Sequence, residues 1–363
     1  MVQLYKFWHL TVLVCAALAW NLHPAAASCG TATCPLDLSG HESLQMLHGK
    51  TAPGLTLQLA FEDIDQDQPR SGSDKVPFGQ VRRPDHDEIE TENRNVRLLA
   101  EWAVSPRWAV SLALPVLKRS HSHLAQDGHH RDDEEDDHSG KLAADDRDLE
   151  GELESWNFTH LGDLTAWGRY APRPNLLSGK AVFSLGLGIG IPTGSTDVRN
   201  DEGDLAEPTL QPGRGAWALL FDTSFEYQLR SALSFAGRRS ARFFASTFYR
   251  INFQGEENYE FGGEWVSHLG SQYPLWQRVN FLGQFVARWS GRDKAGYSGE
   301  LTDATGGTYL YLSPGLQFDL GQGISLYGYY QIPVHQDVNQ VQITSDRNLL
   351  LGLGYRFDLS SRL

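Results

Sequence analysis

Apolar and polar residues alternate with a period of two along much of this chain. In the stretch GLTLQLAFED, Leu55, Leu57, Leu59 and Phe61 share one face, and the residues between them are mostly polar. Successive side chains of a strand point to opposite faces, so the pattern predicts strands with one apolar side. We count twelve such segments, centred near residues 59, 99, 112, 166, 186, 222, 248, 264, 283, 314, 329 and 353.

The length of these segments distinguishes between two all-β architectures. Strands of soluble sandwiches usually have about five or six residues, whereas a tilted membrane crossing needs about ten. The segments reach the longer length, and twelve is an even number, as single-chain bacterial barrels prefer. The sequence therefore predicts an all-β transmembrane antiparallel β-barrel of twelve strands over residues 54–363.

The connections between segments alternate between short and long, as expected for short periplasmic turns and long extracellular loops. The predicted turns cover residues 105–107, 172–179, 229–241, 270–275 and 321–323. The predicted outside loops cover residues 64–90, 118–159, 191–214, 254–258, 290–306 and 335–346. At the tightest turn, Gly321–Gly323, a three-residue hairpin loop would bring Phe318 opposite Leu326.

The first residues predict export. Lys6 precedes an apolar run, and Ala25–Ala27 offer the small residues of a cleavage site, so residues 1–27 read as a signal peptide. Residues 28–53 then form a periplasmic lead, in which Cys29 and Cys34 are a candidate disulfide. Lipidation of Cys29 is the alternative, but Ala26 stands where such a signal needs a leucine-like residue. No later run has the ~18 apolar residues of a membrane helix. The predicted location is the outer membrane of a Gram-negative bacterium.

Three motifs carry a family resemblance. They are LGDLTAWGRYAP from Leu161, LGLGIGIPTGS from Leu185 and LSPGLQFDL from Leu312. The chain resembles the MetA-type outer-membrane proteins, a family linked by name to phenol degradation and often described as transporters. The resemblance implies a barrel that passes small molecules, and it brings no catalytic motif. Near the end, Gly352, Tyr355 and Phe357 resemble the signal read by the outer-membrane assembly machinery, although the chain ends at Leu363 instead of an aromatic residue.

Glycine occupies every second position of FSLGLGIGIPTG. The spacing of Gly186, Gly188 and Gly190 fits neither the dinucleotide fingerprint nor a P-loop, because no helical run and no lysine follow. In a barrel strand these glycines would face the lumen. We expect them either to let Trp167 of the neighbouring strand lie flat or to keep a passage open.

The polar side of the strands predicts the lumen lining. The candidate residues are Glu62, Asp163, Trp167, Arg169, Gly186, Gly188, Gly190, Asp222, Glu226, Arg250, Glu264, Arg278, Arg288, Tyr327 and Tyr329. Acids and arginines facing each other across a narrow barrel can select solutes by charge and shape. Alternatively, they neutralise one another and plug the lumen. The tyrosines and Trp167 would stack against solutes or simply fill space beside glycines.

One predicted outside loop, residues 118–160, carries most of the charge. Between residues 121 and 154 the chain has five histidines, thirteen acids and three basic residues, a charge of −10 in a total of −14. The candidate metal ligands are His121, His123, His129, His130, Asp132, Asp133 and His138, which suit copper, zinc, nickel or calcium. The alternatives are a solvated acidic segment, or acids bridged by divalent cations to lipopolysaccharide.

These observations leave three classes of function. The first is passage of a small solute across the outer membrane, with no required cofactor. The second is metal capture or metal-linked transport through the acidic loop. The third is a non-conducting structural or surface-interaction barrel. An enzyme is not predicted, because no spacing signature joins His160 or His268 to Ser246 or Ser267. The negative charge also argues against a nucleic-acid partner.

Overall fold

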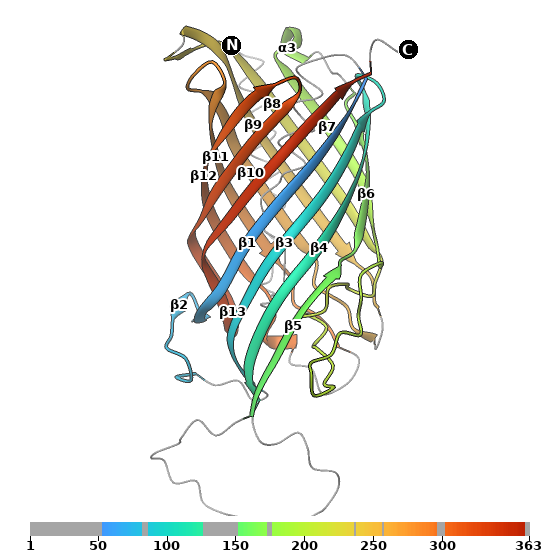
Figure 1. The fold of residues 1–363 in the computed structure, drawn as a ribbon, viewed down its shortest axis with the longest axis vertical. Helices are drawn as coiled ribbons and strands as arrows, with labels where there is room; N and C mark the ends of the chain where they lie inside the picture. Colours follow the sequence, from blue (N-terminus) through green and yellow to red (C-terminus); the bar gives the residue numbers. More distant parts are fainter. Residues whose placement is uncertain are drawn as a thin grey trace, which may run out of the picture.

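A single antiparallel β-sheet closes into a barrel (Figure 1). The computed structural model describes residues 53–81, 86–125, 152–172, 176–235, 237–255, 258–295 and 302–359. Its strands are β1 (Gly54–Gly72), β2 (Asp74–Lys75), β3 (His86–Ala103), β4 (Trp108–Ala125), β5 (Glu152–Leu161), β6 (Leu164–Tyr170), β7 (Ala181–Ile191), β8 (Ala218–Ser234), β9 (Gly237–Asn252), β10 (Glu264–Pro274), β11 (Val279–Ser290), β12 (Gly307–Gly321) and β13 (Ile324–Asp358). The short helices are α3 (Leu176–Gly179) and η3 (Thr302–Ala304). None of the helices in these ranges is long and apolar enough to span a membrane.

The ring is closed by the long strand β13. Its first arm pairs with β12 from Ile324 to Val338, and its second arm pairs with β1 from Val338 to Asp358. The chain reverses between the arms, where Gln340 adopts a positive φ of 48°. Eleven strands form the closed ring, while β2 and β5 lie outside it. Because β13 crosses twice, the wall has twelve crossings, and the predicted barrel with its strand count is confirmed.

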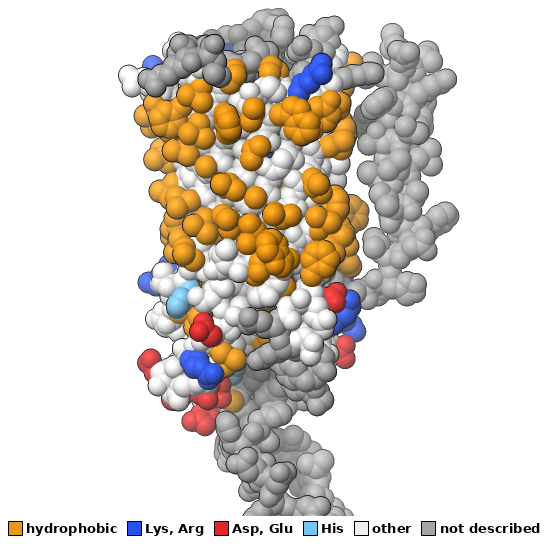
Figure 2. All heavy atoms as spheres, turned by 90° about the vertical axis from the view of Figure 1, so that its right-hand side faces the viewer, with side chains coloured by type: hydrophobic (Ala, Val, Ile, Leu, Met, Phe, Trp, Pro, Cys, Tyr) orange, Lys and Arg blue, Asp and Glu red, His pale blue; other side chains and the backbone are white. Residues whose placement is uncertain are grey.

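The outer wall is apolar, as the alternation predicts. Apolar residues point outward from strands around the ring, among them Leu57, Leu98, Leu187, Phe285 and Leu353, all about half exposed. Figure 2 shows that such side chains cover the wall over most of its height, while charged side chains gather towards the lower end. A belt of exposed apolar surface on this scale marks a lipid-facing wall.

The two ends of the barrel differ. The start of β1 and the end of β13 lie together at one end, called here the termini end (top of Figure 1). At this end the hairpin between β12 and β13 has the predicted register, with Phe318 opposite Leu326. Gly321, Gln322 and Gly323 all adopt positive φ values of 83°, 55° and 83°, which two glycines make possible.

At the opposite end, called the loop end, the strands continue beyond the predicted crossings. The predicted loop 335–346 is wrong, because β13 runs through it with only a tight turn at Gln340. The predicted loop 118–160 is shorter at both ends, since β4 continues to Ala125 and pairs with β5 from Glu152. Polar residues outside a membrane can remain in a sheet, so loss of the apolar alternation does not end a strand.

The fourth crossing is interrupted. β5 and β6 both pair with β4, β5 at the loop end and β6 towards the termini end, and Gly162 and Asp163 separate them. The segment from Pro192 to Trp217, called here the inner segment, connects β7 to β8.

Candidate functional site

The inner wall of the barrel brings together most of the predicted lumen residues. Side chains at every second position of each strand are buried, whereas their neighbours on the outer face are exposed. Glu62, Trp167, Arg169, Asp222, Glu226, Arg250, Glu264, Arg288, Tyr327 and Tyr329 all occupy inward positions of this alternation.

Arg278 is a correction to the predicted lining. It lies between the end of β10 and the start of β11, in an exposed turn at the termini end. The alternation of β11, continued back by one residue, would assign Arg278 to the inner face. The alternation does not show, however, that the strand begins only at Val279.

The glycines of β7 make room for β6 and β8. Trp167 lies opposite Gly188 and Arg169 lies opposite Gly186 in the register between β6 and β7. A Cβ atom on Gly188 would lie 2.6 Å from Cδ2 of Trp167. A Cβ atom on Gly186 would overlap the carboxylate of Asp222. The glycine row is therefore a flat surface on which an indole ring and an ion pair rest.

Arg169 is the centre of a buried ionic group. Its Nε atom donates to Oδ2 of Asp222 at 2.9 Å, and its Nη1 atom lies 3.4 Å from Oε2 of Glu101. All three side chains are at most one-tenth exposed. The guanidinium also lies 5.5 Å from the centre of the Trp167 ring. Four strands, β3, β6, β7 and β8, thus meet in this group on one side of the lumen.

Other inward acids have arginine partners as well. Nη2 of Arg97 lies 2.5 Å from Oε1 of Glu62, and Nε of Arg242 lies 3.7 Å from Oε1 of Glu226. Burial of a charge is costly unless an opposite charge lies close by, which explains why acids and arginines are placed opposite each other.

Aromatic and aliphatic side chains fill the opposite side of the lumen. Tyr309 and Tyr311 of β12 stack with their ring centres 6.3 Å apart, and Tyr327 and Tyr329 of β13 meet edge to face at 6.5 Å. They belong to a buried cluster that includes Val286, Leu282 and Leu350. As expected for packing beside glycine, the Tyr329 ring covers Gly315 and the Tyr327 ring covers Gly352.

Phe248 connects the two sides. It packs against the tyrosine cluster, and its ring centre lies 5.7 Å from that of Trp167. Side chains from β6, β9, β12 and β13 therefore form one aromatic group inside the barrel, called here the aromatic constriction, which consists of Trp167, Phe248 and the four tyrosines.

Charged residues gather on the loop-end side of this constriction. Glu264 lies 2.8 Å from Nε of Arg288, whose guanidinium lies 5.7 Å from the centre of the Tyr309 ring. Arg250 and Arg214 belong to the same electrostatic group. Three arginines thus converge from β9, β11 and the inner segment.

The inner segment folds against the inner face of β4 and β5. Its residues Val198, Ala206 and Leu210 form a buried cluster with Trp156 and Phe158 of β5. Asp163 accepts hydrogen bonds from the backbone N–H groups of Gly194 and Arg214 at 3.0 and 2.9 Å, which fixes both ends of the segment. Asp163, a predicted lumen residue, therefore anchors the segment that enters the mouth of the barrel.

Arg119 of β4 holds the middle of the inner segment. Its Nη1 atom donates to the carbonyl oxygens of Thr209 and Leu210 at 3.1 and 2.6 Å, and its Nε atom donates to Oδ1 of Asn93 at 2.8 Å. Burial lowers the pKa of Arg119 to about 10, opposed by the nearby carboxylate of Glu88. The guanidinium still carries its charge at neutral pH, so these contacts are charge-assisted. No sequence signal points to this role.

The two histidines of the predicted metal set that the structure describes lie inside the barrel wall. His121 and His123 belong to β4, not to a loop, and both are buried. A chain of contacts runs from Oγ1 of Thr91 to His121 at 2.8 Å, from His121 to His123 at 3.2 Å, and from His123 to Oε2 of Glu154 at 3.2 Å.

No group of three or more His, Cys, Asp or Glu residues suited to a metal ion occurs in the described ranges. His129, His130, Asp132, Asp133 and His138 lie outside those ranges, as do Cys29, Cys34 and the predicted signal peptide.

His268 makes a hydrogen-bond contact inside the barrel instead of forming a surface site. Its Nδ1 atom lies 3.3 Å from Oγ of Ser246, and both residues are buried on the inner wall. The other predicted base, His160, lies 3.2 Å from Oγ of Ser195 at an exposed position.

Carboxylates gather on the outer surface just beyond the apolar belt. Burial raises the pKa of Asp65, and the neighbouring carboxylates of Asp67 and Glu92 raise it further, while Arg347 lowers it. Burial also raises the pKa of Glu90, which faces Asp65 and Glu92. The loop end therefore carries a negative outer surface in the described part of the chain.

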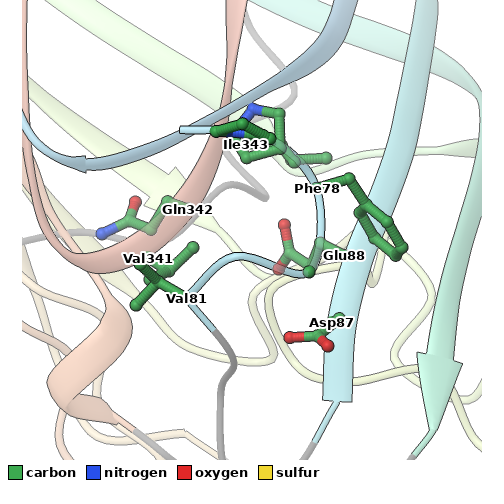
Figure 3. A pocket seen from close by; sticks show the side chains of 10 residues that line it. Phe78, Val81, Asp87, Glu88, Val341, Gln342 and Ile343 are labelled. Carbon is green, nitrogen blue, oxygen red and sulfur yellow. The ribbon is translucent and has the colours of Figure 1, made fainter. Parts of the chain in front are cut away.

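A recess of about 290 Å³, open to solvent, lies at the same end between β1, the start of β3 and the turn of β13 (Figure 3). Phe78, Val81, Val341 and Ile343 supply apolar walls, and Asp87 and Glu88 supply carboxylates. The centres of water molecules can occupy only about 10 Å³ of it, which is room for about one water molecule.

Comparison with known proteins places the fold among outer-membrane barrels. No protein-family model matches the chain, and no curated protein matches it. The crystal structure of the COG4313 outer membrane channel from Pseudomonas putida F1 is similar, with a TM-score of 0.53 and 12% sequence identity over 84% of this chain and 96% of that one.

Two further structures are similar at lower scores. One is a Pseudomonas aeruginosa FadL homologue, with a TM-score of 0.39 and 10% sequence identity over 93% of this chain and 99% of that one. The other is the CymD monoaromatic hydrocarbon channel, with a TM-score of 0.36 and 9% sequence identity over 94% of this chain and 99% of that one. At these identities the likeness concerns the fold. The likeness to the COG4313 channel, at a TM-score of 0.53, agrees with the closed antiparallel barrel that the strand pairing shows.

Proposed function

We propose that this protein lies in the outer membrane of a Gram-negative bacterium and passes a small solute through its lumen. One observation carries the proposal: a closed barrel has an apolar outer belt and an inner wall of charged, amide and aromatic side chains. An apolar outer face suits lipid, and a polar inner face suits contact with solutes instead of a protein core.

The proposal includes the direction in which the barrel sits. The loop end, with its long strands and acidic surface, faces the cell exterior, and the termini end faces the periplasm. This orientation agrees with short turns at the termini end and with a signal peptide preceding the barrel. Lipopolysaccharide and the assembly machinery are the partners it implies. Assignment to the MetA-type family, which rests on the three sequence motifs, is part of the same proposal.

Passage of a solute is tested by swelling of liposomes that contain the purified barrel. We expect vesicles with the protein to swell in small solutes faster than empty vesicles. Gly190→Trp places a bulky ring on the inner face of β7 and should slow swelling severalfold. Leu187→Trp changes the outer face of the same strand and should leave the rate unchanged, because Leu187 is 56% exposed towards lipid.

A folded barrel is identified by its altered mobility in gels before and after heating. Folded protein that causes no swelling beyond that of empty vesicles would contradict the proposal. The same conclusion would follow if Gly190→Trp and Leu187→Trp had equal effects.

A further inference from the structure

Arg250 is an inward-facing arginine without a partner. It lies on β9, on the same face as Arg242 and Phe248. Its Nε atom is buried and has no hydrogen-bond partner. No ion pair joins Arg250 to any residue of the described ranges, whereas Arg97, Arg169, Arg242 and Arg288 each contact a carboxylate.

The acids near Arg250 have other partners. Arg214 and Arg288 both lie close enough to repel it, and the nearby acids are Glu264 and Asp163. Glu264 is already engaged by Arg288 at 2.8 Å. Asp163 accepts the backbone N–H groups at the two ends of the inner segment. Arg214 has a further carboxylate nearby, that of Asp293. The two acids near Arg250 itself are thus both engaged by other groups, and neither forms a close ion pair with it.

An arginine in such surroundings favours the binding of an anion from solution. Burying part of an arginine without a hydrogen-bonded counter-charge is costly, and a carboxylate accepts two parallel N–H bonds from a guanidinium. Arg250 as a whole is intermediate in exposure, neither fully buried nor fully exposed.

Aromatic rings define the other half of the site. Phe248 precedes Arg250 by two residues on the same face of β9, and its ring lies 5.7 Å from Trp167. Arg288 connects the charged group to the ring of Tyr309. A solute whose carboxylate meets Arg250 therefore has its other end towards the aromatic constriction.

We infer that Arg250 is the anion-binding residue of the lumen and that the preferred solute is a small carboxylate with an apolar, ring-sized body. The inference deepens the proposed function and rests on it in taking the lumen as open to solutes. Arg214 and Arg288 contribute positive potential, while the aromatic constriction contacts the apolar body.

Binding of benzoate to the purified barrel in detergent, measured by calorimetry, tests this assignment without requiring transport. Benzyl alcohol, which has the same ring and no charge, is the matched ligand. We expect wild type to bind benzoate at least about tenfold more tightly, since a charge-assisted pair is worth more than a neutral hydrogen bond. Arg250→Gln should abolish the difference, and Arg250→Lys should retain part of it.

Arg242→Gln is the matched control variant, because Arg242 lies on the same face of the same strand and has Glu226 as its partner. It should keep the preference for benzoate. The assignment is overturned if wild type binds neither ligand, binds both equally, or loses nothing in folded Arg250→Gln. Swelling without benzoate binding would overturn this inference alone, and benzoate binding without swelling would overturn the proposed function alone.

Discussion

Replacing Arg169 with methionine is expected to lower the free energy of unfolding by about 3–5 kcal/mol, the usual cost of breaking a buried ion pair from one side. The change removes the arginine that lies between the carboxylates of Glu101 and Asp222, which are both at most one-tenth exposed. It also removes the cation that lies over the Trp167 ring. Urea unfolding of the barrel in lipid vesicles measures the effect.

Arg292→Met provides the comparison. Arg292 pairs with Asp303 at 3.1 Å, but the two side chains are 41% and 73% exposed. Exposed pairs contribute about 0–1 kcal/mol, so this variant should unfold almost as wild type does. If both variants lost the same free energy of unfolding, the Arg169 group would not be buried as described.

The second large effect is expected within the glycine row of β7. Gly188→Ala should cost about 1–3 kcal/mol, the range for overpacking a filled interior. Its Cβ would lie 2.6 Å from Trp167 and 2.8 Å from the carbonyl oxygen of Ala166, so both the indole and the backbone must move. The unfolding free energy in lipid vesicles is again the measurement.

Gly190→Ala is the matched change, two residues further on the same face. Its Cβ would lie 3.1 Å from the Cβ of Ala218 and 3.7 Å or more from other atoms, which needs only a small adjustment. Alanine also reduces the entropy of the unfolded chain, so we expect a change of less than about 1 kcal/mol. If Gly188→Ala were as mild as Gly190→Ala, the indole would not rest on the glycine row.

The fold could be predicted from the sequence because a strand has a strict period of two. The alternating apolar residues face outward on most crossings, as at Leu57 and Phe285. The pairing of Phe318 with Leu326 followed from the length of a single turn. The predicted strand ends are wrong where apolar alternation stops but pairing continues, as at His121, His123 and the turn at Gln340. It also failed at Arg278, where the period continues but the strand has not begun.

The partners inside the lumen could not be predicted, because they depend on register between strands that are distant in sequence. Arg169 meets Asp222 only through the offset of β6, β7 and β8. The inward course of the inner segment depends on Arg119 and Asp163, whose hydrogen bonds to backbone groups have no sequence signature. The lack of a hydrogen-bond partner for Nε of Arg250 cannot be predicted from the sequence, because it depends on the positions of all the side chains around it.

A single account connects these features. Glycines on β7 let Trp167 and Arg169 lie flat, Phe248 joins them to the tyrosines, and the inner segment brings Arg214 towards Arg250. The lumen is therefore lined by aromatic rings at its middle and by Arg214, Arg250 and Arg288, with their acidic neighbours, on its loop-end side. A passage of this kind would admit small solutes and exclude large ones.

Conductance of single barrels in a planar lipid bilayer tests the central claim, passage through the lumen, most directly. The account predicts small, discrete current steps, and it predicts that Gly190→Trp reduces the step size while Leu187→Trp does not. Folded protein that inserts into the bilayer but carries no current at any salt concentration or voltage would contradict it.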